Sequence, residues 1–186
     1  MTSVIKFVLV IVVVLLASIT HAADGTIKFD GHLVDQTCTV SVDGVVSPAV
    51  ATVTLPTISA GLLNAPGKVA GRTDFEITLS NCQGLANGAK AFFEGGADVE
   101  PISGQLINRG DATNVRLQLL DNVDGVGAPI KVGDGFEQLI FSGNVYISNG
   151  DGTGAGVLPY AVQYIATGIA TAGSIQSTVT YSIQYL

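Results

Sequence analysis

Apolar and polar residues alternate with a period of two in five runs of this sequence, and this pattern constrains the fold more than any other feature. A period of two places one set of side chains on a buried face and the other set in water, as in a half-buried β-strand. Thr, Val, Ile and Tyr dominate the runs, as is typical of strands. The runs cover residues 26–33, 75–79, 115–119, 160–164 and 179–185.

Turn-forming pairs separate these runs. Asn-Gly and Asp-Gly tolerate positive φ and mark tight connections. Beyond residue 22, no stretch sustains a long helical period with proper caps. Several short strands between turns predict one all-β domain, an antiparallel β-sandwich of immunoglobulin type. The turn signals lie at 43–44, 64–67, 87–88, 124–125, 134–135 and 149–152.

The first 22 residues have the pattern of a cleaved secretory signal peptide. A start that carries Lys6 precedes the apolar run 7–19, and Thr20-His21-Ala22 places small residues where signal peptidase needs them. A membrane anchor is the alternative, but about 13 apolar residues fall short of the roughly 20 that span a bilayer. We therefore expect export, and no membrane span in the mature chain.

Export sets the expectation for the cysteines. The sequence has two, Cys38 and Cys82, and in an exported chain they most simply form one disulfide. Two free thiols are the alternative.

Composition and motifs argue against several kinds of function. A formal net charge of −7, with no cluster of Lys or Arg, disfavours nucleic-acid binding. Two histidines and two cysteines leave little for a metal site, and the acidic turns 121–125 and 149–152 lack the ligand spacing of an EF-hand. His32 is accompanied by no Gly-x-Ser-x-Gly motif. We expect no enzymatic activity, no catalytic residue, no metal and no cofactor.

The two ends of the mature chain admit two interpretations. In the last run, large apolar residues share one face and nothing after Leu186 would cover the free edge of the strand, which is an aggregation hazard. An alternating ribbon also begins near residue 25. Either the first strand pairs with the last and closes the sandwich, as in a lectin-like module that binds a sugar or another ligand, or one chain completes the sheet of another by β-augmentation.

Five segments resemble the chaperone–usher fimbrial subunits, the type 1 pilin family, in family order. The first has a glycine, alternating apolar residues, a second glycine and then the first cysteine. The last has a glycine 14 residues from the end and a penultimate tyrosine. The resemblance covers essentially the whole mature chain, and its segments are 25–38, 79–82, 112–121, 158–167 and 173–186.

This resemblance implies an immunoglobulin-like sandwich that lacks its last strand and is completed by a donor strand from another chain. A periplasmic chaperone would first fill the open groove and hold the terminal carboxylate of Leu186 with basic residues. At an outer-membrane usher, the extension of the next subunit would then replace the chaperone strand. The product is a cell-surface fimbrium that supports adhesion, with neighbouring fimbrial subunits as partners.

The resemblance also assigns residues to these roles. It implies a donor-strand extension over 23–35 and a pilin domain over 36–186. The donor residues would be Gly25, Ile27, Phe29 and Leu33. The acceptor groove and chaperone-binding strand would contain Gly173, Val179, Tyr181, Ile183, Tyr185 and Leu186.

Overall fold

The computed structural model describes residues 28, 37–47, 49–83, 88–141, 145–146 and 154–186. The chain divides into two units, Met1–Leu33 and Val34–Leu186, and all the described residues except Lys28 belong to the second. Within the described ranges, no helix is long and apolar enough to cross a membrane.

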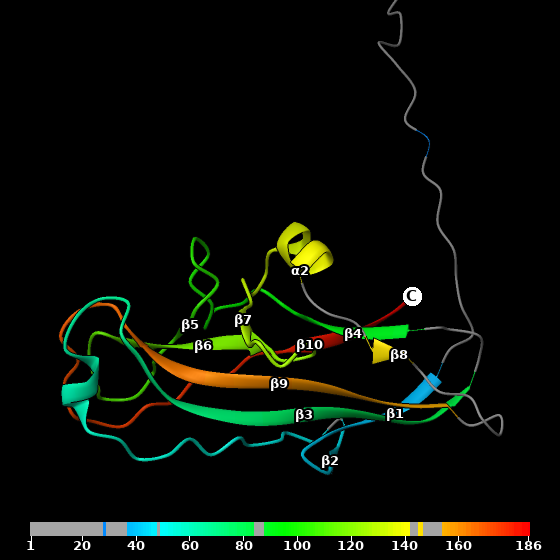
Figure 1. Cartoon of the computed structure of the whole chain (residues 1–186), viewed down its shortest axis with the longest axis horizontal. Coiled ribbons are helices and arrows are strands. Elements are labelled where there is room, and N and C mark those ends of the chain that lie inside the picture. The colour runs from blue at the N-terminus through cyan, green and yellow to red at the C-terminus, as the bar shows by residue number, and fades with distance from the viewer. Residues whose placement is uncertain (1–27, 29–36, 48, 84–87, 142–144, 147–153) are drawn as a thin grey trace, which may run out of the picture. The chain divides into compact units, whose positions relative to one another are not determined.

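The described strands form two antiparallel sheets. The larger has the order β2-β1-β3-β9-β6-β5, with β7 also paired to β6. Figure 1 shows β3 and β9 as long neighbouring strands at its centre. Its strands are β1 (Thr37–Val42), β2 (Val45–Val46), β3 (Val69–Gln83), β5 (Leu106–Ile107), β6 (Val115–Asp121), β7 (Ala128–Pro129) and β9 (Gly154–Ala166).

The smaller sheet has the order β10-β4-β8, with β4 at Gly88–Phe93, β8 at Val145–Tyr146 and β10 at Tyr181–Tyr185. A short 3-10 helix, η1 (Ala60–Leu63), and one α-helix, α2 (Gly135–Phe141), complete the described elements. The core joins the two sheets, since the Phe93 ring meets the Tyr160 ring edge to face at 5.0 Å. The predicted all-β, antiparallel architecture is confirmed.

Most predicted strands are present where the alternation indicated them. The runs 75–79, 115–119 and 160–164 lie inside β3, β6 and β9, and the run 179–185 contains β10. The run 26–33 lies outside the described residues except for Lys28. Strand β4 was not predicted because Gly88–Lys90 are buried in succession, so the strand shows no alternation.

Helix α2 replaces a predicted turn at 134–135. The Asp134 carboxylate accepts hydrogen bonds from the backbone N–H groups of Phe136 and Glu137, at 3.1 and 3.0 Å, and so caps the helix start. The helix buries Gln138 and exposes Phe136 and Leu139. This inverted pattern gives no amphipathic signal in the sequence.

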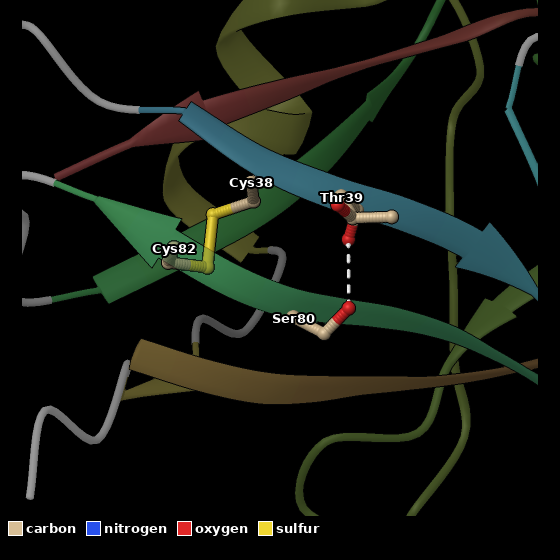
Figure 2. The surroundings of a disulfide bond; sticks show 4 residues. All are labelled: Cys38, Thr39, Ser80 and Cys82. Atoms are coloured by element: carbon tan, nitrogen blue, oxygen red, sulfur yellow. Dashed lines mark hydrogen bonds between the residues drawn. A yellow bond between two sulfur atoms is a disulfide. The ribbon is translucent and has the colours of Figure 1, made fainter. Parts of the chain in front are cut away.

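The disulfide between Cys38 and Cys82 is present, with Cα atoms 4.0 Å apart, and joins β1 to β3 (Figure 2). A bulge aims Cys82 at its partner. Ile77 and Leu79 point into the core, but Asn81 has a φ of 51° and the register shifts there, so that Cys82 also points inward. Asparagine tolerates this left-handed conformation better than most residues.

Side chains seal the edge of β4 that faces away from β10. The Ala91 N–H donates to the Tyr160 hydroxyl at 3.1 Å. The Gln138 side-chain amide accepts from the Phe93 N–H at 2.8 Å and donates to the Phe93 carbonyl at 3.0 Å, as a neighbouring strand would. Beyond them, Ala89 pairs with Val145 of β8. This edge is therefore closed to further strands.

We predict that Tyr160→Phe lowers the free energy of unfolding by about 1–3 kcal/mol, because the buried Ala91 N–H loses its partner. Burial raises the pKa of Tyr160 to about 12, so its hydroxyl is neutral under ordinary conditions. Urea denaturation gives the value. Tyr164→Phe is the control, since its hydroxyl donates to the carbonyl of the exposed Pro56, which water can replace. Equal losses in the two variants would contradict the prediction.

Candidate functional site

The edge of β10 that faces away from β4 has no partner among the described residues. In Figure 1, β10 lies beside β4 close to the C-terminus. The Thr180 carbonyl accepts from Glu94 at one end of the pairing, and the Leu186 N–H donates to Gly88 at the other, both at 2.9 Å. Backbone groups of even-numbered residues therefore face β4. Those of the odd-numbered residues Tyr181–Tyr185 face the open edge.

This open edge continues upstream of β10, with the same alternation between even-numbered and odd-numbered residues. The Ser174 carbonyl accepts from the Ala112 N–H at 3.0 Å, and the Gln176 carbonyl accepts from the Arg109 N–H at 2.7 Å. Here too the even-numbered residues bond to the domain, while the odd-numbered ones make no backbone–backbone hydrogen bond within the described chain. Among the described residues, the backbone groups of the odd-numbered residues thus form one continuous open edge within the segment 174–186.

The side chains of the odd-numbered residues form an apolar row along this edge. They are half-buried and, Ser177 apart, pack against the core, whereas Gln176, Thr178 and Thr180 are exposed. The predicted set Val179, Tyr181, Ile183 and Tyr185 therefore does share one face. The row as a whole consists of Ile175, Ser177, Val179, Tyr181, Ile183 and Tyr185.

A second apolar row lies on the extended segment 50–58. Thr52 and Thr54 are exposed, and no described residue makes a backbone–backbone hydrogen bond with this segment. The alternation Ala51-Thr-Val-Thr-Leu55 is visible in the sequence and could have indicated the segment, but it was not among the predicted runs. The residues of this row that pack against the core are Ala51, Val53, Leu55 and Ile58.

Two tyrosines of β10 reach toward the β1–β2 hairpin with their hydroxyls. The Tyr181 hydroxyl lies 3.2 Å from the Ser47 hydroxyl, and Tyr185 is hydrogen-bonded to the backbone of Cys38. Burial raises the pKa of Tyr185, and the bond to Cys38 partly opposes this shift. Side chains, rather than a backbone ladder, thus link β10 to β1 in the described part of the chain.

The remaining predicted site residues have other positions. A Cβ at Gly173 would lie 2.5 Å from the Ala112 nitrogen, so Gly173 allows close backbone packing rather than lining the apolar row. Leu186 is exposed. The four predicted donor residues, and His32, lie outside the described residues.

Other binding chemistry has little support in the described ranges. No group of His, Cys, Asp or Glu there could hold a metal ion. A cavity of about 330 Å³ between Gly95, Pro101 and Asp134 has no aromatic lining, and Asp134 is already engaged by Lys131 at 2.9 Å. Nothing in this cavity favours the sugar-binding alternative.

The upstream half of the open edge should be sensitive to acid. Hydrogen bonds from Thr178 and Arg109 lower the pKa of Asp98. A carboxyl group with a lowered folded pKa stabilises the fold above its unfolded pKa, about 3.9, and loses this contribution as the pH falls through the folded value. We predict a loss of amide protection around Gln176 below about pH 4.

Hydrogen exchange between pH 2 and 5, corrected for intrinsic rates, measures this loss. Asp98→Asn should abolish the step, whereas Asp74→Asn, which removes an exposed carboxylate on β3, should leave it intact. The same acid step in wild type and Asp98→Asn would contradict the assignment to Asp98.

Comparison with known proteins places the chain among fimbrial subunits. Residues 55–186 match the family described as "FimA: Type-1 fimbrial protein, A". The F17 fimbrial protein of Escherichia coli is 42% identical over 97% of this chain and 98% of the relative. The major fimbrial subunit SMF-1 of Stenotrophomonas maltophilia (strain K279a) is 41% identical over 89% of this chain and 94% of the relative.

A solved structure supports the fold. The crystal structure of the P pilus rod subunit PapA matches with a TM-score of 0.54 and 17% identity, over 80% of this chain and 99% of PapA. The expected incomplete immunoglobulin-like sandwich is therefore confirmed. The relatives are structural fimbrial proteins, which also supports the expectation of a chain without enzymatic activity.

Proposed function

Because the chain belongs to the type-1 fimbrial protein family and is a structural subunit of a cell-surface fimbrium, we propose that its open edge at 174–186 accepts a donor strand from a neighbouring subunit. The donor is the segment 23–35 of that neighbour. Together with the row on 50–58, the apolar row along the edge forms the acceptor groove.

The single observation that carries this proposal is that the odd-numbered residues of the edge direct their backbone hydrogen-bonding groups away from the domain. A strand that joins a sheet forms hydrogen bonds with the N–H and C=O groups of every second residue on the edge it meets. On this edge, the odd-numbered residues 175–185 present these groups in one continuous series. The same residues carry the half-buried row. An added strand would therefore gain ladder bonds and apolar contacts together.

The proposed donor has matching chemistry and length. Its residues Ile27, Phe29 and Leu33 alternate with polar ones, so one face can enter the groove while the other stays in water. Each fully buried side chain of this kind contributes about 1.5–3 kcal/mol. The segment 23–35 is as long as the edge 174–186. Gly25 would lie where the groove admits no side chain.

The route to the surface is part of the same proposal. Cleavage after Ala22 would release the donor segment in the periplasm, where an uncovered apolar edge favours aggregation. A chaperone strand that covers the edge would prevent this, and an outer-membrane usher would be the place of exchange. Every assembled copy would thus be both donor and acceptor, as a head-to-tail filament requires.

The first test compares two proteins by urea unfolding and size-exclusion chromatography. One is the mature chain 23–186, and the other carries residues 24–35 again after Leu186, joined by a short turn. We expect only the second protein to be a stable monomer, because its own added strand fills the groove. A mature chain that is monomeric and equally stable would show that the sheet is already complete.

A charge in the acceptor groove should block assembly. We predict that Val179→Asp abolishes filaments, because burying an unpaired carboxylate against the core is strongly unfavourable. Thr180→Asp is the matched control, since the neighbouring Thr180 is exposed. Electron microscopy of the cell surface measures the outcome. Normal filaments from Val179→Asp would exclude this groove.

Gly25→Leu should likewise block assembly while chaperone-bound subunit persists.

A further inference from the structure

The open edge is longer than β10, although no strand of the described chain pairs with its first half. We propose that Asn108 and Asp98 are positioning residues, whose side chains replace a neighbouring strand and hold 174–178 extended for the donor. This inference rests on the proposed function, because it states which part of the edge the donor strand can use and what makes that part available.

Asn108 makes the backbone contacts that a strand would make. Its side-chain oxygen accepts from the Gln176 N–H at 2.8 Å and from the Gly110 N–H at 2.9 Å. Its side-chain nitrogen donates to the carbonyls of Ala112 at 2.8 Å and Ser174 at 3.3 Å. One amide thus joins the loop after β5 to two even-numbered residues of the edge, and uses its donor and acceptor atoms on both sides.

Asp98 holds the next even-numbered residue. Its carboxylate accepts from the Thr178 hydroxyl at 2.5 Å and from the Arg109 guanidinium at 2.7 Å. The position of Asp98 is itself anchored, because its carbonyl accepts from the Ile107 N–H of β5 at 2.7 Å. Charged groups form the stronger hydrogen bonds, and this one connects the edge to the larger sheet.

These contacts extend the pattern seen in β10, in which even-numbered residues bond to the domain and odd-numbered residues face the open edge. Holding Ser174, Gln176 and Thr178 on one side leaves the backbone of Ser177 and Val179 directed to the other, in line with the open edge of β10. The buried Ser177 hydroxyl has no hydrogen-bond partner in the described chain. A buried polar atom of this kind needs an explanation, and a strand paired along 175–179 would bring polar backbone atoms beside it.

Hydrogen exchange on filaments of the full chain tests this inference. Peptides over 173–180 and 180–186 are followed in the unassembled chain and in filaments of the wild type, Asn108→Ala and the milder Thr178→Val. We expect assembly to protect both peptides of the wild type. In the two variants, 173–180 should exchange roughly fivefold to tenfold faster in filaments, the factor for one net hydrogen bond, while 180–186 is unchanged.

The control is Asn122→Ala, which removes an amide that contacts Arg72 at 2.8 Å and should leave both peptides as in the wild type. If assembly protects 180–186 but not 173–180, or if both variants leave 173–180 fully protected, the inference is wrong and the proposed function stands. If assembly protects neither wild-type peptide, the proposed function fails, and the inference with it.

Discussion

The structure depends on the need of every backbone N–H and C=O for a partner. The smaller sheet meets this need unequally at its two edges. On the far side of β4, the Tyr160 hydroxyl and the Gln138 amide satisfy backbone groups that a missing strand would otherwise pair. On the near side, nothing in the described chain does this for β10. In the described chain, the smaller sheet therefore has one edge without a partner, and apolar side chains remain half-buried along it.

Hydrogen bonds from polar side chains hold elements in place where the strands are short. Lys90, buried in β4, donates to the carbonyls of Gln138 and Leu139 at 3.1 and 2.9 Å and so ties α2 to the sheet. Burial lowers the pKa of Lys90, and the charge of Asp121 opposes this shift. Around the edge, Asn108 and Asp98 act in a similar way on 174–178. The Lys90–Gln138 contact is buried, whereas the contacts of Asn108 with Gln176 and of Asp98 with Thr178 lie at the exposed edge. A polar network is most effective when each member is satisfied.

Sequence patterns indicated the strands that have one wet and one buried face. Strands β3, β6 and β10 alternate for this reason. In β9 the residue types alternate even though Tyr160, Ala161 and Val162 are all buried, so this strand too could be predicted. Strand β4 could not, because burial on both faces removes the alternation, and α2 could not, because it buries Gln138 and exposes Phe136. The segment 50–58 carried a visible pattern but no turn or motif that marked its role.

The sequence by itself therefore determined the fold class, the disulfide pairing and the inward face of Val179, Tyr181 and Ile183, because these follow from local period and from cysteine number. Only the tertiary structure decided which edge has no partner in the described chain and how far this edge extends. Those properties depend on contacts between residues distant along the chain, such as Asn108 with Gln176 and Tyr160 with Ala91. No local pattern encodes such contacts, since each partner alone is compatible with many folds.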